Sequence, residues 1–369
     1  MSYLGRFASA LTVGLVALAI LWPAEPNAQV TNPYRAIRGW AKVGTRTMGV
    51  AAGVYQDPDG KHMWVMDRCG GNNCAGVDVD PFLQFDMEGN LVKSFGKNVF
   101  GWPHGFFVDR QGNVWGTEGG PVGEARGQPG FKIGRGHQIH KFSPDGKKIM
   151  SLGEANVAGD DAGHFNGPSH VAVDRNGDVW VTDGHRGGNN RLIRYDSTGK
   201  FKMQIGGGVK SATSERGLFN DPHHIAFDGE GRLFVSDRGN NRIQIFDPEG
   251  KFLAVWTQYG RPSSVASQGD TVYVVDGTSN PNSNPGWEKG IRVGSVTTGW
   301  VQYLIPADLQ MLNEKTGGTV DTEFIGLDSQ GNIYAGEVQG QNLIKYVLSP
   351  WYKQKSGAGI NVFRPVGSQ

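Results

Sequence analysis

The stretch Pro222-His-His-Ile-Ala-Phe-Asp-Gly-Glu-Gly-Arg-Leu-Phe-Val-Ser-Asp237 decides the fold, because the chain repeats it. Residues 168–183 read Pro-Ser-His-Val-Ala-Val-Asp-Arg-Asn-Gly-Asp-Val-Trp-Val-Thr-Asp, and a similar Asn-Arg run follows both stretches, at Asn190 and at Asn241. Counting weaker copies, repeat units begin near Val50, Pro103, Pro168, Pro222, Pro262 and Thr322. Self-similarity on this length scale predicts a repeat architecture.

Each unit alternates apolar and polar residues over short runs, separated by Asp-x-x-Gly turns such as Asp174-Arg-Asn-Gly and Asp328-Ser-Gln-Gly. This is the pattern of four short antiparallel strands. Such small sheets cannot bury both faces alone, and they stack as blades around a channel. We therefore predict an all-β fold, a six-bladed β-propeller over residues 34–349. Residues 34–43 supply a strand that closes the ring against the blade ending near Tyr346, and residues 350–369 form a peripheral tail.

The composition agrees with a folded β protein and excludes several classes of function. The chain has 369 residues, of which 57 are glycines and 38% are hydrophobic, so it has many tight turns and enough apolar surface for a large core. Its formal net charge of +1 creates no global field that would attract nucleic acid. We expect no nucleic-acid partner, and no feature of the sequence indicates an oligomeric state.

The first residues have the pattern of an export signal. Arg6 precedes an apolar run over residues 8–22, and small residues lead to a cleavage point after Ala28. The run is shorter than a typical membrane span, although an uncleaved anchor is the alternative. We predict a signal peptide over residues 1–28, a periplasmic or secreted protein, and no stable membrane insertion once the signal is removed.

The chain has two cysteines, Cys69 and Cys74, on one Gly-rich segment. In an exported protein they are expected to form a local disulfide. A metal site that also uses His62 is the alternative, and it is weak because the chain has no second cysteine pair.

Equivalent positions of the repeat place side chains around one mouth of the channel. The residue after the blade-opening position is, in blades two to six, His104, Ser169, His223, Ser263 and Glu323. His104, His223 and Glu323 fall in alternate blades, so they converge on the axis as two nitrogen ligands and one oxygen ligand. Such a set suits zinc, and also Fe(II) or Mn(II). The alternative is that these histidines only pack, as we expect of His170 and His224 one position later.

A second ring lies at the ends of the next strands. It consists of Asp67-Arg68, Glu118, Asp183-Gly-His185, Asp237-Arg238, Asp276 and Glu337. Arg68 and Arg238 can bind a carboxylate through two hydrogen bonds, or form ordinary salt bridges with neighbouring acids. His185 lies on a Gly-rich turn, where it is either a general base or a solvated loop histidine.

These repeats resemble the NHL family, in which propellers serve as enzymes and as binding scaffolds. The segments Pro103-His104-Gly, Pro222-His223, Asp67-Arg68 and Asp237-Arg238-Gly-Asn resemble motifs of the peptidyl-α-hydroxyglycine α-amidating lyases. That resemblance implies a zinc ion on His104 and His223, catalytic arginines at Arg68 and Arg238, and a structural calcium ion on the backbone carbonyl of Val50. The chain departs from the pattern of that family at three positions. Glu323 stands where the family has a third histidine ligand, Phe324 where it has an aspartate, and His185 where it has a tyrosine.

The sequence thus predicts an exported metal-dependent lyase that splits a hydroxyglycine-like C–N bond into an amide and glyoxylate. Its substrate is a small molecule or a peptide C-terminus, its metal ligands are His104, His223 and Glu323, and its catalytic residues are Arg68, His185 and Arg238. The alternative is a non-enzymatic propeller that binds a ligand or a protein in the cell envelope. The Gly-rich insertions over residues 119–140 and 278–290 fit either function.

Overall fold

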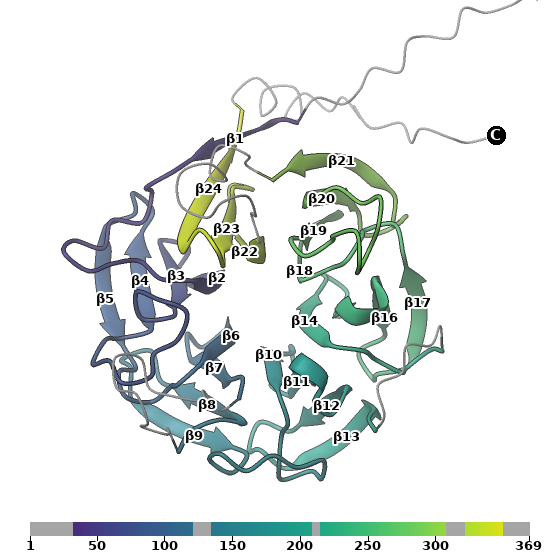
Figure 1. Ribbon diagram of the computed structural model, residues 1–369, viewed down its shortest axis with the longest axis horizontal. Helices are drawn as coiled ribbons and strands as arrows, with labels where there is room; N and C mark the ends of the chain where they lie inside the picture. Colours follow the sequence, from purple (N-terminus) through teal and green to yellow (C-terminus); the bar gives the residue numbers. More distant parts are fainter. Residues whose placement is uncertain (1–31, 121–133, 209–214, 308–321, 350–369) are drawn as a thin grey trace, which may run out of the picture. The chain divides into compact units, whose positions relative to one another are not determined.

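The computed structural model describes residues 32–120, 134–208, 215–307 and 322–349. Within them the chain forms six four-stranded antiparallel sheets, arranged as the blades of a β-propeller with β2, β6, β10, β14, β18 and β22 around the central channel (Figure 1). The predicted all-β, six-bladed architecture is confirmed. The predicted signal peptide (residues 1–28) and C-terminal tail (residues 350–369) lie outside the described residues.

The strands of each blade follow one another in the chain from the channel outward. The first blade holds β2 (Ala51–Gln56), β3 (His62–Asp67), β4 (Phe82–Asp86) and β5 (Leu91–Phe95). The second holds β6 (Pro103–Val108), β7 (Val114–Glu118), β8 (Gln138–Phe142) and β9 (Lys148–Leu152). The third holds β10 (Pro168–Val173), β11 (Val179–Asp183), β12 (Arg191–Tyr195) and β13 (Phe201–Gly206). The fourth holds β14 (Pro222–Phe227), β15 (Leu233–Asp237), β16 (Arg242–Phe246) and β17 (Phe252–Trp256).

The last two blades complete the ring. The fifth holds β18 (Ser264–Gln268), β19 (Thr271–Asp276), β20 (Gly290–Ser295) and β21 (Val301–Pro306). The sixth holds β22 (Thr322–Leu327), β23 (Ile333–Glu337) and β24 (Asn342–Leu348), with β1 (Tyr34–Ile37) at its outer edge. Two 3-10 turns, η1 (His185–Gly187) and η2 (Arg238–Asn240), follow β11 and β15. Among the described residues, no helix is long and apolar enough to cross a membrane.

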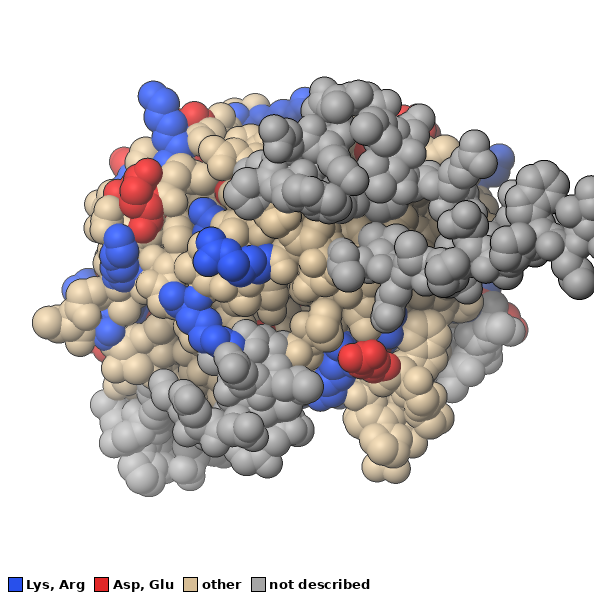
Figure 2. Space-filling model, turned by 90° about the horizontal axis from the view of Figure 1, so that it is seen from above, with Lys and Arg blue, Asp and Glu red and all other residues tan. Residues whose placement is uncertain are grey.

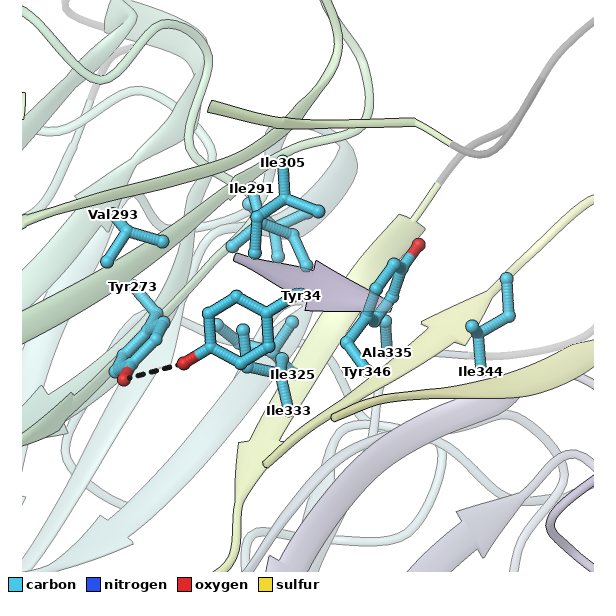
Figure 3. Packing of buried hydrophobic residues seen from close by; sticks show 11 residues of the cluster. Tyr34, Tyr273, Ile291, Val293, Ile305, Ile325, Ile333, Ala335, Ile344 and Tyr346 are labelled. Atoms are coloured by element: carbon cyan, nitrogen blue, oxygen red, sulfur yellow. Dashed lines mark hydrogen bonds between the residues drawn. The ribbon is translucent and has the colours of Figure 1, made fainter. Parts of the chain in front are cut away.

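The ring is closed by pairing the two ends of the propeller. Strand β1 lies antiparallel to β24, with Tyr34 opposite Leu348 and Ala36 opposite Tyr346, as predicted, although the strand ends at Ile37 rather than Val43. Tyr34 packs into an apolar cluster that spans the fifth and sixth blades, and its hydroxyl lies 3.3 Å from that of Tyr273 (Figure 3). This one side chain therefore couples the N-terminal strand to two blades.

The Asp-x-x-Gly motif forms a turn because the aspartate caps the backbone. Asp174 accepts hydrogen bonds from the backbone N–H groups of Asn176 (2.8 Å) and Asp178 (3.0 Å), and Gly177 takes a φ of 87°. The other oxygen of Asp174 accepts the indole N–H of Trp180 at 3.1 Å, which ties the turn to the blade core. Asp109, Asp228 and Asp328 accept the equivalent backbone N–H groups in their own blades.

A buried carboxylate ends the second strand of each blade and binds the segment that leads into the first strand. Asp237 accepts the N–H of Asn220 at 2.8 Å, and Asp183 accepts the N–H of Asn166 at 2.8 Å. The same contact joins Asp67 to Gly49, Glu118 to Gly101 and Trp102, and Asp276 to Arg261, while Glu337 accepts the hydroxyl of Thr322. These carboxylates fix the point where each inner strand enters the channel mouth.

Charged side chains of both signs lie on the face of the protein that Figure 2 shows. The face drawn in Figure 2 carries both basic and acidic side chains among a larger area of uncharged residues, which agrees with the near-neutral formal charge.

Cys69 and Cys74 form the predicted disulfide, and the alternative of a metal site there does not hold.

We predict that truncating Tyr34 destabilises the whole propeller. Tyr34→Ala removes a buried ring and should lower the free energy of unfolding by about 3 kcal/mol, whereas Tyr34→Phe removes only the hydroxyl and should cost about 1 kcal/mol. Urea denaturation followed by tryptophan fluorescence measures both values. Val92→Ala on the exposed edge strand β5 is the control and should stay within about 0.5 kcal/mol of the starting protein. Equal stability of Tyr34→Ala and the control would contradict the proposed role in closure.

Candidate metal centre

Three histidines from three consecutive blades meet at one mouth of the channel. His104 is the second residue of β6, His223 is the second residue of β14, and His185 begins η1 after β11. One ring nitrogen of each lies within 4.8 Å of the others. Two of these residues are the predicted ligands His104 and His223, and the third donor in the described structure is an imidazole from the intervening blade.

The contacts of His104 and His223 match those of metal-binding histidines. The Nδ1 of His104 donates to the carbonyl of Ser169 at 2.8 Å, and the Nδ1 of His223 donates to that of Ser263 at 2.6 Å. Both rings are fully buried, and the Nε2 of each has no hydrogen-bond partner among the described residues. Two unpaired, buried lone pairs would be costly unless a ligand satisfies them, and the backbone carbonyls supply the outer contacts that usually orient metal-bound imidazoles.

His185 reaches the same point from a loop. The glycines around it allow the tight turn: the N–H groups of Gly184 and His185 both donate to the carbonyl of Gly167, at 3.0 and 2.9 Å. The imidazole Nδ1 lies 2.9 Å from a carboxylate oxygen of Asp221 and 3.0 Å from a guanidinium nitrogen of Arg238, and the side chain is only 8% exposed. A carboxylate on Nδ1 favours the tautomer whose Nε2 is free to bind a metal.

Burial keeps all three imidazoles neutral. It lowers the pKa of His104 and of His223 well below the usual value, and the neighbouring His185 and Arg238 lower them further. Burial also lowers the pKa of His185, against the opposing effect of Asp221. Neutral imidazole is the metal-binding form, so the site is prepared for a cation at neutral pH. These donors therefore fit a zinc ion, and three nitrogen ligands also suit Fe(II).

Arg68 is a buried cation beside the histidines, and among the described residues it forms no ion pair, although the charge of Glu323 acts on it from a distance. Its Nε donates to the carbonyl of Pro103 at 2.9 Å and its Nη1 to Asn72 at 2.7 Å, while Nη2 is buried without a partner. Burial lowers its pKa to about 10. A buried guanidinium with a free N–H group can bind an anion.

The indole ring of Trp102 contacts two guanidinium groups next to this site. The Cζ atoms of Arg68 and Arg186 lie 5.1 and 4.2 Å from the ring centroid of Trp102. The indole also packs against the ring of His104 at 5.2 Å. The disulfide lies beside this group, because it closes the loop that carries Asn72.

Arg238 binds two carboxylates and is not free for a ligand in the way that Arg68 is. It donates to Asp221 at 2.9 Å and to Glu323 at 3.1 Å. Burial opposes its charge, but the two carboxylates outweigh burial and raise the pKa of Arg238. The predicted third ligand, Glu323, is thus engaged in an ion pair with Arg238, outside the group formed by the three histidines. The prediction of a carboxylate ligand remains untested.

The remaining residues singled out in the sequence make hydrogen bonds or packing contacts within the propeller. The carbonyl of Val50, the predicted calcium ligand, accepts the N–H of Arg68 at 2.9 Å. Ser169 continues the hydrogen-bond pattern of the histidines, because its hydroxyl donates to the carbonyl of Pro222 at 2.7 Å. His170 and His224 stack on each other inside the channel at 3.7 Å, away from the three-histidine group, as expected for packing residues.

Sequence analysis missed Trp102, Arg186 and Asp221. Trp102 and Asp221 occupy one column of the repeat, the residue immediately before the blade-opening proline. Comparing this column between blades could have found both, since they are the positions that contact His104 and His185. Arg186 follows His185 on the loop and carries no signal in the repeat.

Comparison with known proteins identifies the repeats. Residues 165–195 and 219–246 match the model of the NHL repeat. Peptidyl-glycine alpha-amidating monooxygenase A of Xenopus laevis is 30% identical over 303 residues, which cover 77% of this chain and 28% of that protein. A probable peptidyl-alpha-hydroxyglycine alpha-amidating lyase of Caenorhabditis elegans is 34% identical over 163 residues, 43% of this chain and 41% of that protein.

A third relative has a name that states no activity. NHL repeat-containing protein 3 of Homo sapiens is 29% identical over 280 residues, 73% of this chain and 72% of that protein. The chain therefore spans less than half the length of the two relatives named for amidation and most of the length of the third. Among solved structures, a streptogramin B lyase has a TM-score of 0.51 at 15% identity, covering 86% of this chain and 98% of the other, and shows the shared fold alone.

We predict that His185, rather than Glu323, is the third zinc ligand. His185→Ala should weaken zinc binding more than about 100-fold, since removing only the outer partner of a metal ligand typically costs 10- to 100-fold. Glu323→Gln should stay within about threefold of the starting protein. Competition with a chromogenic chelator measures both, with His62→Ala at the surface as the control. A loss in Glu323→Gln as large as in His185→Ala would restore the carboxylate as the ligand.

We also predict an unusual pH dependence of zinc affinity. Protons compete with zinc only where the imidazoles can be protonated, and the pKa of each of the three is lowered. Affinity should therefore stay level as the pH falls from 8 to about 6.5, the ordinary histidine pKa, and decline only below it. Chelator competition at several pH values tests this, and a decline that begins above pH 7 would contradict it.

Proposed function

We propose that this protein is a metal-dependent lyase of the amidating type, which converts an α-hydroxyglycine derivative into an amide and glyoxylate. The observation that carries the proposal is the pair of buried, unpartnered Nε2 atoms of His104 and His223 beside His185. The guanidinium of Arg68 lies next to them, and its Nη2 has no hydrogen-bond partner among the described residues. The similarity to two relatives named for amidation supports it.

The residues around the histidines suit a substrate with a carboxylate next to the reacting carbon. Arg68 offers its free Nη2 to that carboxylate, and Trp102 provides an apolar wall next to it. Arg186, whose guanidinium also contacts the ring of Trp102, adds a second positive charge to the same area. Charge-assisted hydrogen bonds of this kind fix both the position and the orientation of an anionic substrate.

A bound zinc ion would act as a Lewis acid toward the substrate oxygen. Removal of the hydroxyl proton starts the reaction, the carbon–nitrogen bond breaks, and the nitrogen takes up a proton as the amide leaves. His185 was predicted as the base, but its Nδ1 contact with Asp221 and its place among the histidines favour a ligand role. Glu323 is then the carboxylate available to accept the proton, and Arg238 positions it through the 3.1 Å ion pair.

The location of the protein remains part of this proposal. We infer export to the periplasm or beyond from the signal-like residues 1–28, and the disulfide between Cys69 and Cys74 suits an oxidising compartment. The proposed substrate is a small molecule or a peptide C-terminus.

The experiment supplies the zinc-loaded protein with N-benzoyl-α-hydroxyglycine and measures glyoxylate and benzamide. We expect equal amounts of both products, and a loss of at least about 100-fold in kcat/KM for Arg68→Ala and for His104→Ala. The methyl ester of the same substrate lacks the carboxylate, so it should be a poor substrate of the starting protein and should lose little more with Arg68→Ala. His62→Ala is the matched histidine control. Absence of glyoxylate from a protein shown to hold one zinc ion would rule out the lyase.

A non-enzymatic binding propeller is the second candidate. The chain covers 72% of human NHL repeat-containing protein 3, against 28% and 41% of the two relatives named for amidation. Metal analysis separates the two candidates, because a folded protein that binds no zinc at His104 and His223 leaves the scaffold as the better assignment.

A further inference from the structure

The channel has a second opening, at the ends of the inner strands opposite the histidines. A pocket of about 390 Å³ lies there. Its walls come from the last residues of all six inner strands, among them Tyr55, Phe107, Phe227 and Leu327. These strands surround the central axis in Figure 1. The volume is within the range of about 300–1,000 Å³ that is usual for small-molecule sites.

The wall of this pocket is apolar and incompletely buried. Tyr55, Phe107, Phe227 and Leu327 are half-buried, although they belong to the innermost strands of the ring. Apolar side chains on the inner strands of the other mouth are fully covered, as Phe324 illustrates at 1% exposure. Half-exposed apolar groups in a concave site favour a ligand that covers them.

The rim carries positive charge that the protein does not neutralise. Arg110 is exposed and has no ion pair among the described residues, and Arg175 donates only to the carbonyl of Gly229 at 3.0 Å. The two acids of the rim are already paired: Asp174 with Arg194 at 3.1 Å and Asp228 with Arg232 at 2.6 Å. Arg110 and Arg175 follow neighbouring inner strands, β6 and β10, so both guanidiniums border one side of the pocket.

This pocket is separate from the three-histidine group. His224 lies between His223 and the pocket residue Ile225 along β14, and its ring stacks on that of His170. The hydroxyl of Tyr55, a pocket residue, lies 3.3 Å from the Nε2 of His170. A buried layer of these rings therefore divides the channel into two sites.

We propose that this second mouth binds a small apolar molecule with a single anionic group, its body against the inner strands and its charge at Arg110 and Arg175. The proposal does not depend on the lyase activity. It rests on an apolar wall, a drug-sized volume and two unpaired guanidiniums at one side, the combination that recognises an amphiphilic anion.

The test compares two dyes that share a ring system and differ in charge. Anilinonaphthalene-8-sulfonate carries the anionic group and N-phenyl-1-naphthylamine lacks it. Titration of the full chain, followed by dye fluorescence and calorimetry, should give one site for the sulfonate. Arg110→Gln with Arg175→Gln should weaken sulfonate binding roughly tenfold, as expected for loss of a charge-assisted hydrogen bond, and leave the neutral dye within about twofold.

Two further variants complete the test. Arg35→Gln, on the edge strand β1, is the matched arginine control and should leave both dyes unchanged. Ala266→Leu narrows the pocket and should weaken binding of both dyes, while an unchanged far-UV circular dichroism spectrum reports that the fold is kept. The proposal would be overturned if Arg35→Gln weakened sulfonate binding as much as the double variant Arg110→Gln with Arg175→Gln, or if the double variant left sulfonate binding unchanged.

Discussion

The buried carboxylate at the end of each second strand is the contact on which the rest of the propeller depends. In five blades it accepts the backbone N–H of the segment that enters the first strand, at 2.8 Å for both Asp183 and Asp237, and in the sixth blade Glu337 accepts the hydroxyl of Thr322. Burial raises the pKa of Asp183 to about 6 and also raises the pKa of Asp237, so ionising these two acids is costly. The N–H donors and the adjacent arginines, Arg191 and Arg242, compensate that cost. The carboxylates thus place every blade opening at one depth in the channel.

The three-histidine group follows from this fixed depth. Because the blades enter in register, the second residue of each inner strand can reach the carbonyl of the next blade: His104 binds Ser169, Ser169 binds Pro222, and His223 binds Ser263. The hydrogen bond that joins one blade to the next uses the Nδ1 of each histidine. The Nε2 of each histidine therefore has no hydrogen-bond partner among the described residues. Packing between blades and orientation of the proposed metal ligands therefore depend on one set of contacts, and a change that shifts the blades would affect both.

The sequence predicted what repeats and missed what does not. The blades, the aspartate-capped turns and His104 and His223 all sit at fixed positions of a repeating unit, so alignment of the units located them. His185 lies on a loop where Arg186 takes a positive φ of 55°, and strand periodicity says nothing about the direction of a side chain on such a loop. Glu323 aligns with the histidines, yet the position alone could not reveal that Arg238, from the strand end of another blade, pairs with it.

The charges around this mouth of the channel favour the proposed anionic substrate. Three guanidiniums, of Arg68, Arg186 and Arg238, surround the histidines, and two carboxylates, of Asp221 and Glu323, accompany them. The carboxylates both bind Arg238, and among the described residues neither Arg68 nor Arg186 forms an ion pair, although the charge of Glu323 acts on Arg68 from a distance. A divalent ion on three neutral imidazoles would add to the positive charge of these arginines, because none of these ligands is anionic. A substrate carboxylate is the natural counter-charge, and the low-dielectric surroundings of Arg68 make its binding there stronger than it would be at an exposed arginine.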